Sequence, residues 1–144
     1  MIAIIKAKFN SHITDLLEAG CTEYLKEQNR NYKVFECPGA IETVVYSKAL
    51  IDTGRYKSII VIGAIIKGDT DHYEYVCQYV THGISMLSTQ YTIPIIFGIL
   101  TTQNEELAYK RAALDQMNKG KEFAETAIYM MDAFNMIPQP GLPK

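Results

Sequence analysis

The chain contains 144 residues, of which 48% are hydrophobic and 21% charged, and its formal net charge is -2. A chain of this length is expected to form one domain, residues 1–144, with a substantial core. Its scattered Lys and Arg residues and slightly negative charge exclude a nucleic-acid-binding surface, and its longest apolar run, residues 59–66, is far too short to span a membrane.

The first part of the chain alternates between the patterns of strands and helices. Residues 2–6 are a short apolar run that predicts a strand, and apolar residues at helical spacing predict an amphipathic helix over residues 11–28. A second strand is predicted at 32–36, where Cys37-Pro38-Gly39 ends it. A second helix follows, with apolar positions between residues 41 and 49 and Gly54 as its C-terminal cap.

The most informative stretch is the third predicted strand, residues 58–66, together with the turn that follows it. Its β-branched run is typical of a strand buried on both faces. Gly68 allows a sharp turn and a close approach of the backbone to a ligand. Thr70 or Asp71 is expected to cap the next helix, whose free N–H groups favour an anion. His72 then falls on the first turn of that helix, beside the expected anion site.

The remaining elements continue the alternation. A long helix is predicted over residues 73–87, and a fourth strand over 93–100 with Pro94 near its start. Thr102 and Glu105 have the spacing of a capping box for a fourth helix. A last helix is expected over 118–134. The proline-rich tail, residues 137–144, is expected to be irregular.

Strands that alternate with helices predict a parallel sheet covered by helices on both faces. We therefore expect an α/β fold of the flavodoxin-like, doubly wound type, a three-layer α/β/α sandwich around a four-stranded parallel sheet. Ligands of such folds bind at the carboxyl ends of the strands. The segments expected there are 7–10, 37–42, 67–72 and 98–102.

Cysteine usage and the amino terminus favour a reduced, cytoplasmic protein. Cys21, Cys37 and Cys77 are odd in number and widely spaced, which is typical of free thiols buried as small apolar side chains. The amino-terminal MIAIIKAKFN has too short an apolar core for a signal peptide, and Lys6 and Lys8 interrupt it. No metal site is expected, because the histidines lack the spacing of metal ligands.

Six segments, in order, carry a family resemblance: KFNSHIT, PGAIE, GAIIKGDTDHYEYV, FGILTT, KRA and NKGKE. Together they resemble lumazine synthase, the penultimate enzyme of riboflavin biosynthesis, over residues 2–131. The resemblance implies condensation of 5-amino-6-ribitylaminouracil with 3,4-dihydroxy-2-butanone 4-phosphate to dimethyl-ribityllumazine, phosphate and water. It implies no metal and no organic cofactor. It also implies a homopentamer, or a multiple of one.

The resemblance assigns proton transfer to His72, which is chemically apt because histidine titrates near ~6.5. It assigns phosphate binding to Arg111, whose guanidinium can donate two parallel hydrogen bonds. Asp69, through its backbone N–H, and Thr70, through its hydroxyl, match the pair that contacts the same phosphate. Lys67 is a further candidate cation.

The resemblance also implies where the pyrimidine substrate lies. An aromatic side chain is expected to stack on the ring, two short segments to contact the ring and the ribityl chain, and one residue to come from the neighbouring subunit. These residues are, in that order, Phe9; Ala64, Ile65 and Ile66 along the ring; Ala40, Ile41 and Glu42 along the ribityl chain; and Phe97 from the neighbour. Lys119 and Glu122 match a lysine and an acid near the active site.

Structural interpretations compete with several of these roles. Phe9 could be an ordinary core residue, since aromatic side chains mostly serve packing. Glu42 could simply stabilise the start of a helix through the helix dipole. Lys119 and Glu122 have the spacing of a surface ion pair. His12 and His82 have no neighbouring motif, and they are expected to be structural or surface residues.

The chain departs from the family pattern at three places. Many members carry an aromatic residue where Ile41 stands. Ala113 and Met117 replace glycines, so a more helical connection is expected between KRA and NKG. The chain also begins at the first strand, without the extension that pairs with a neighbouring sheet in many members. The last two departures are expected to affect assembly more than the active site, and a pentamer or decamer is favoured over a capsid.

Two functions of other classes remain open at the level of the sequence. The first is a shell or scaffold protein, because the family can build hollow capsids of pentamers. The second is a flavodoxin-like module that binds a flavin or a pterin without turnover. Phe9, His72 and Arg111 favour catalysis, since a scaffold has no use for them and a binding module leaves the phosphate residues idle.

Overall fold

The four predicted strands form one parallel sheet in the computed structural model, which describes residues 1–138, 140 and 141. The strand order is β2-β1-β3-β4. The strands are β1 (Ile2–Ala7), β2 (Tyr32–Cys37), β3 (Ser58–Ile66) and β4 (Ile95–Thr102). The two inner strands are almost wholly buried, which explains why their sequences are continuous apolar runs rather than alternating ones.

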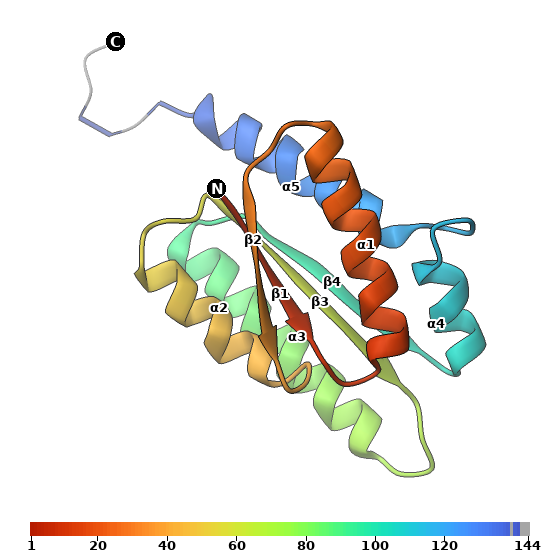
Figure 1. The fold of residues 1–144 in the computed structure, drawn as a ribbon. Coiled ribbons are helices and arrows are strands. Elements are labelled where there is room, and N and C mark those ends of the chain that lie inside the picture. The colour runs from red at the N-terminus through yellow and green to blue at the C-terminus, as the bar shows by residue number, and fades with distance from the viewer. Residues whose placement is uncertain (139, 142–144) are drawn as a thin grey trace.

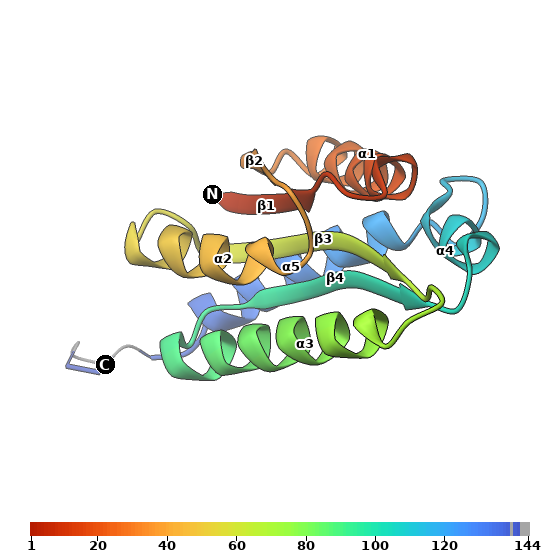
Figure 2. The same ribbon diagram turned by 90° about the horizontal axis from the view of Figure 1, so that it is seen from below.

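Within the described residues, five helices cover the two faces of the sheet (Figures 1 and 2). One face carries α1 (Ser11–Glu27), α4 (Glu105–Ala112) and α5 (Lys119–Asn135), and the other carries α2 (Glu42–Asp52) and α3 (His72–Tyr91). The core is accordingly double, and successive residues of β3 alternate between its two halves. The predicted three-layer, doubly wound fold is confirmed.

Two details around β4 differ from expectation. The strand begins at Ile95 rather than 93, because proline has no N–H to extend the pairing toward the amino end; the carbonyl of Pro94 accepts the N–H of Ile59 in the first bond of the β3–β4 ladder. The predicted capping box is wrong: Thr102 is the last residue of β4, and Asn104 caps α4 by accepting the N–H of Leu107 at 2.9 Å.

The connection between α4 and α5 is a run of turns and not the helical segment that was expected. Residues 114–117 form turns that are closed by bonds to the carbonyls of Lys110 and Ala113. Asn118 takes the left-handed conformation, with φ 44°, which glycine adopts most readily and asparagine also tolerates. Residues 137, 138, 140 and 141 lie outside helices and strands, as expected, whereas the prediction for 139 and 142–144 lies outside the described residues.

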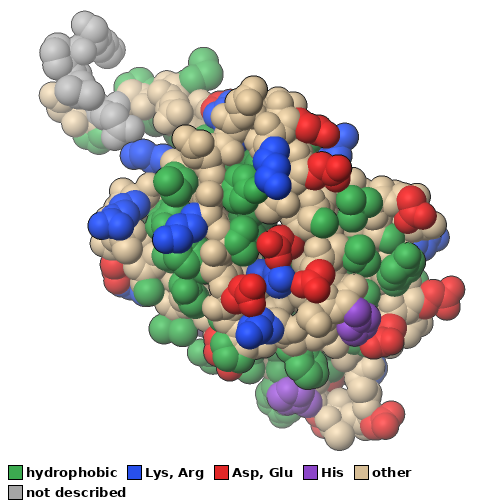
Figure 3. Space-filling view, viewed as in Figure 1, with side chains coloured by type: hydrophobic (Ala, Val, Ile, Leu, Met, Phe, Trp, Pro, Cys, Tyr) green, Lys and Arg blue, Asp and Glu red, His purple; other side chains and the backbone are tan. Residues whose placement is uncertain are grey.

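A buried lysine of β1 forms ion pairs with two acidic residues of α1 that reach the surface. Lys6 is 8% exposed, and its Nζ lies 2.6 Å from Asp15 Oδ1 and 2.6 Å from Glu18 Oε2. Burial lowers the pKa of Lys6, but the hydrogen bonds and charges of the two acids outweigh burial and raise it above its ordinary value. Acidic and basic side chains meet in this way at the centre of the face shown in Figure 3. The network therefore stabilises the loop between β1 and α1.

Gly54, predicted as a helix cap, follows α2 with φ 66°, and its N–H is bonded to Ile51. Within the part of the chain that the structure describes, no helix combines the length and apolar character that a membrane span requires.

Candidate active site

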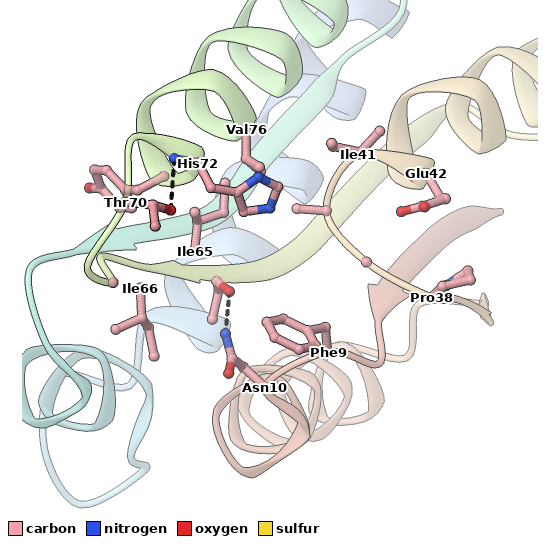
Figure 4. A pocket seen from close by; sticks show the side chains of 15 residues that line it. Phe9, Asn10, Pro38, Ile41, Glu42, Ile65, Ile66, Thr70, His72 and Val76 are labelled. Carbon is pink, nitrogen blue, oxygen red and sulfur yellow. Dashed lines mark hydrogen bonds between the residues drawn. The ribbon is translucent and has the colours of Figure 1, made fainter.

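Three of the four strand-end segments that were expected to bind a ligand converge on one cleft. Its volume is about 560 Å³, and it lies at the carboxyl edge of the sheet between the β1–α1, β2–α2 and β3–α3 connections (Figure 4). The fourth segment, after β4, does not reach it. The lining residues are Phe9, Asn10, Pro38, Gly39, Ala40, Ile41, Glu42, Ala64, Ile65, Ile66, Gly68, Thr70, His72, Tyr73 and Val76.

The turn after β3 brings His72 into the cleft. Asp71 occupies the N-cap position of α3, but its side chain accepts no capping hydrogen bond, so the expected side-chain cap is not formed. The N–H of His72 instead donates to Thr70 Oγ1 at 3.3 Å, which forms a turn just before the helix. Thr70 and His72 are both exposed, and Figure 4 shows the imidazole projecting from the start of α3 into the cleft beside Ile65. An exposed imidazole at a helix start can exchange protons with a bound molecule.

The opposite side of the cleft is formed by Phe9 and Asn10 from the β1–α1 loop. Phe9 is 71% exposed, so it is not the core residue that an aromatic side chain often is. Its backbone N–H donates to the carbonyl of Pro38 at 2.9 Å, which joins two of the cleft-forming loops. Figure 4 shows the ring facing the open space of the cleft, across from His72. An exposed aromatic ring in this place offers a stacking surface for a flat ligand.

The remaining walls are mainly apolar. Ile41, Ile65 and Val76 contribute branched side chains, and Glu42 at the start of α2 is the acidic side chain of the lining. None of the described residues that line the cleft is Lys or Arg. The cleft thus combines an apolar surface with an imidazole and a carboxylate, but it contains no positive side chain that could neutralise a bound phosphate.

The thiol nearest the cleft supports its wall and is not a nucleophile. Cys37 is buried, and its Sγ donates to the carbonyl of Gly39 at 3.4 Å beneath the β2–α2 loop. Burial, together with the charge of Glu42, raises the pKa of the Cys37 thiol to about 11. Burial likewise raises the pKa of the Tyr73 phenol above its usual range. Both groups therefore remain protonated near neutral pH.

Several predicted site residues lie away from the cleft of their own chain. Asp69 belongs to the turn after β3 but is not among the lining residues. Phe97 stands on the edge strand β4 and is 39% exposed. Arg111 lies on α4, where its Nη1 donates to the carbonyl of Leu107 at 3.2 Å. Lys119 forms an ion pair with Glu122 at 2.9 Å, as the surface-pair interpretation predicts.

The other polar candidates form contacts elsewhere on the surface. Lys67 lies 3.8 Å from Glu74, and His12 Nε2 lies 3.2 Å from Glu105 Oε1. His82 is an exposed residue in the middle of α3, outside the cleft.

Sequence reasoning missed some of the lining residues. Pro38 and Gly39 carried a signal, because turn residues after a strand often lie at a ligand-binding edge; Gly68 was not missed, since a close approach of its backbone to a ligand was predicted. Tyr73 and Val76 carried none, since their helical spacing is the pattern of a core stripe. Asn10 follows Phe9 with φ 60°, and an asparagine after a strand is a recognisable left-handed turn signal.

Comparison with known proteins assigns the chain to a family. A family model described as 6,7-dimethyl-8-ribityllumazine synthase matches residues 1–135, which include every residue that lines the cleft. A protein of that name from Coxiella burnetii (strain Dugway 5J108-111) is 39% identical over 133 residues, 90% of this chain and 88% of the relative. Proteins of the same name from strains CbuG_Q212 and RSA 493 / Nine Mile phase I are 38% identical over the same shares.

Proposed function

The chain belongs to the 6,7-dimethyl-8-ribityllumazine synthase family, and from this premise we propose that the cleft at the carboxyl edge of the sheet is its active site. The chain is a transferase of riboflavin biosynthesis. It condenses 5-amino-6-(D-ribitylamino)uracil with 3,4-dihydroxy-2-butanone 4-phosphate to 6,7-dimethyl-8-ribityllumazine, phosphate and water, the penultimate step of the pathway.

The observation that carries the site proposal is that Phe9 borders the same cleft as Thr70 and His72, although Phe9 comes from the β1–α1 connection and the other two come from the β3–α3 connection, far away in the chain. The pyrimidine lies against the Phe9 ring and along the backbone of residues 64–66. Its ribityl chain extends toward Ala40, Ile41 and Glu42 at the start of α2, where a carboxylate can accept hydrogen bonds from hydroxyl groups. The apolar walls exclude water from the reacting ring.

The phosphate of the second substrate lies at the β3–α3 turn, near the N–H of Asp69 and the hydroxyl of Thr70. The start of α3 favours an anion there. The His72 imidazole, two residues further, lies between this end and the pyrimidine end of the cleft. It can take a proton from the condensing amine and give one to the leaving groups, water during imine formation and phosphate during elimination.

A bound phosphate needs a positive partner, and the cleft lining contains none. We assign this role to Arg111, with Lys119 nearby, and place both of them, like Phe97, on the subunit next to the cleft. An unpartnered apolar stripe on α3 suits such an assembly, because Tyr75, Tyr79 and Met86 are between 51% and 69% exposed. The assembly we infer is a homopentamer or a multiple of it, in which each cleft lies at a subunit interface.

Neither the family model nor the named relatives favour a scaffold or a flavin- or pterin-binding protein. We infer a cytoplasmic location, because the three cysteines of the chain are free in the structure and a reducing compartment keeps them so.

The direct test is to incubate the purified protein with both substrates and to record lumazine fluorescence and phosphate release in parallel. We expect equimolar lumazine and phosphate, and no lumazine when either substrate is omitted. Fluorescence without phosphate release would contradict the proposed elimination. Tight binding of riboflavin in the absence of any turnover would instead support the binding-module alternative.

A further inference from the structure

Asn10 connects the two sides of the cleft through its side chain. The residue has φ 60° and ψ 44°, a left-handed conformation that asparagine tolerates better than most residues. Its Nδ2 donates a hydrogen bond of 2.8 Å to the carbonyl of Ala64, 54 positions further along the chain. Figure 4 shows this bond below the cleft, with the Phe9 ring directly beside it.

This hydrogen bond connects the β1 side of the sheet to β3 beyond the point where the backbone pairing of β1 with β3 has ended. The last paired residues of β1 and β3 are Lys6 and Ile62, and β1 itself ends at Ala7. The carbonyl of Ala64 lies beyond this point, where the Asn10 amide satisfies it in place of a backbone N–H. The β1–α1 loop is thereby held against the end of β3, at the backbone that lines the cleft.

Phe9 depends on this contact because its ring is held by little else. Phe9 as a residue is 71% exposed, so the ring is not packed into the core, and its direction is set by the backbone of the loop. One end of the loop is fixed by the Phe9 N–H on Pro38, and the other end is fixed by the Asn10 amide on Ala64. Loss of the amide contact would free one of the two ends.

The structure of α1 does not require the Asn10 side chain. The backbone carbonyl of Asn10 accepts the N–H groups of Ile13 and Thr14 at 2.9 and 3.0 Å, which starts the helix. Any residue that adopts the same backbone conformation preserves these two bonds, so the side chain is available for another role.

We propose that Asn10 is a positioning residue for lumazine formation, whose amide fixes the distance and angle between the Phe9 ring and the backbone of residues 64–66. The inference rests on the proposed function of the cleft, and it goes beyond that function by naming what holds the stacking surface in place. The gap that receives the flat pyrimidine then has a fixed width before binding, so the loop does not have to become ordered when the substrate binds.

Two substitutions remove the amide and preserve the backbone. Asn10→Gly adopts the left-handed conformation without strain, and Asn10→Asp preserves the size of the side chain but presents a carboxylate to the Ala64 carbonyl. The matched control is Asn29→Gly, since Asn29 is also left-handed, with φ 52°, but is exposed at the far end of α1.

The first readout is independent of catalysis. The chain contains no tryptophan, so Phe9→Trp introduces a single indole at the cleft. In this background we expect Asn10→Gly and Asn10→Asp to lower the steady-state fluorescence anisotropy of the indole, and Asn29→Gly to leave it unchanged. An anisotropy that is equal in all three variants would overturn the positioning role.

The second readout is steady-state kinetics of the Asn10 and Asn29 variants in the protein that retains its natural Phe9. We expect both Asn10 variants to raise the KM for the pyrimidine about five- to a hundred-fold, and to change the KM for the butanone phosphate by no more than about two-fold. Equal losses for both substrates, or the same loss in Asn29→Gly, would overturn the proposal. A wild-type protein that forms no lumazine would overturn the proposed function itself, whereas an active wild type with unaffected Asn10 variants overturns only the role of Asn10.

Discussion

His72 is the imidazole that the β3–α3 turn places in the cleft, and its side chain is free to meet a substrate. We expect His72→Ala to preserve the fold and both Michaelis constants and to lower turnover by about ten- to a thousand-fold, the usual scale of acid–base help. Some activity should survive, because the cleft still brings the two substrates together. The measurement is a pH–rate profile at saturating substrates, in which the limb on the acid side should flatten in the variant.

His12→Ala is the control for this prediction, because His12 is paired with Glu105 outside the cleft. It should retain the acid limb and the wild-type turnover. If His72→Ala has unchanged turnover and an unchanged profile, proton transfer belongs to another group, such as the substrate phosphate or water.

Arg111 is expected to act on one substrate only. Removing a bidentate, charge-assisted contact to phosphate costs roughly 1.5–3 kcal/mol, so Arg111→Ala should raise the KM for the butanone phosphate about ten- to a hundred-fold. Arg111→Lys should recover part of this loss, since an ammonium cannot donate in a fork. The control is Arg55→Ala, an exposed residue before β3 at the opposite end of the sheet. An equal rise of both Michaelis constants would identify Arg111 as structural.

The cysteines should differ in reactivity in an order set by burial. Burial raises the pKa of the Cys21 thiol to about 12 and that of Cys37 to about 11. Because only the thiolate reacts, roughly one Cys37 in a thousand is reactive at pH 8, and fewer Cys21. Cys77 also has a raised pKa but is half-buried, so mass spectrometry should find it alkylated first. In urea all three should react at similar rates; fast native labelling of Cys21 would contradict its burial.

Residues that are proposed to contact the substrates were easier to predict from the sequence than residues that hold the cleft in shape. His72, Thr70 and Phe9 stand in strand-end segments whose composition already indicates a ligand site, and the structure places all three on the cleft. Asn10 acts through a hydrogen bond to a residue 54 positions away, and a contact of that separation has no local pattern in the sequence. Val76 looked like an ordinary core residue because one apolar helix face can both pack on a sheet and line a cleft.

Among the helices, α1 and α5 have the most extensive contact with each other, and glycine permits it. A Cβ on Gly120 would collide with the backbone carbonyl of Leu17, and a Cβ on Gly20 with the side chain of Asn118. The carbonyl belongs to the α1 backbone and cannot rotate away. Gly120→Ala should therefore destabilise the protein by roughly 1–3 kcal/mol, since overpacking outweighs the gain in helix propensity of about 1 kcal/mol.

The measurement is the urea midpoint at a fixed protein concentration, because the proposed assembly would contribute to the apparent stability. Gly68→Ala is the control: its Cβ would lie more than 4 Å from the described residues other than its chain neighbours, and a change within about 0.5 kcal/mol is expected. An unchanged midpoint for Gly120→Ala would show that α1 and α5 can separate at no cost.

The bounds of the elements could be predicted wherever a single signal dominated. The run of β3 is apolar from end to end, so its predicted bounds, 58–66, match the observed strand. The start of α4 was mispredicted because Thr102 and Asn104 both have the chemistry of an N-cap. Thr102 belongs to β4 because it pairs with Ile66 of β3, and this tertiary contact is not visible in the local sequence.

At the scale of the whole molecule, alternation of elements was sufficient to predict a doubly wound sheet, since right-handed crossovers leave few arrangements. The relation between subunits leaves no such trace in one sequence. Arg111 and Phe97 are predicted site residues on elements that do not line the cleft of their own chain. If a neighbouring subunit supplies them, each active site combines His72 of one chain with Arg111 of the next, and a separated monomer should be inactive.

Subunit mixing tests this arrangement. His72→Ala and Arg111→Ala are each dissociated, mixed in equal amounts and reassembled, and lumazine formation is compared with that of wild type treated in the same way. A ring of random composition contains about a quarter of sites with both residues intact, so about a quarter of wild-type activity should return. When both residues come from one chain, every site retains one defect and mixing restores nothing. Each variant reassembled alone controls for the treatment, and light scattering that finds a fully active monomer would contradict the shared site directly.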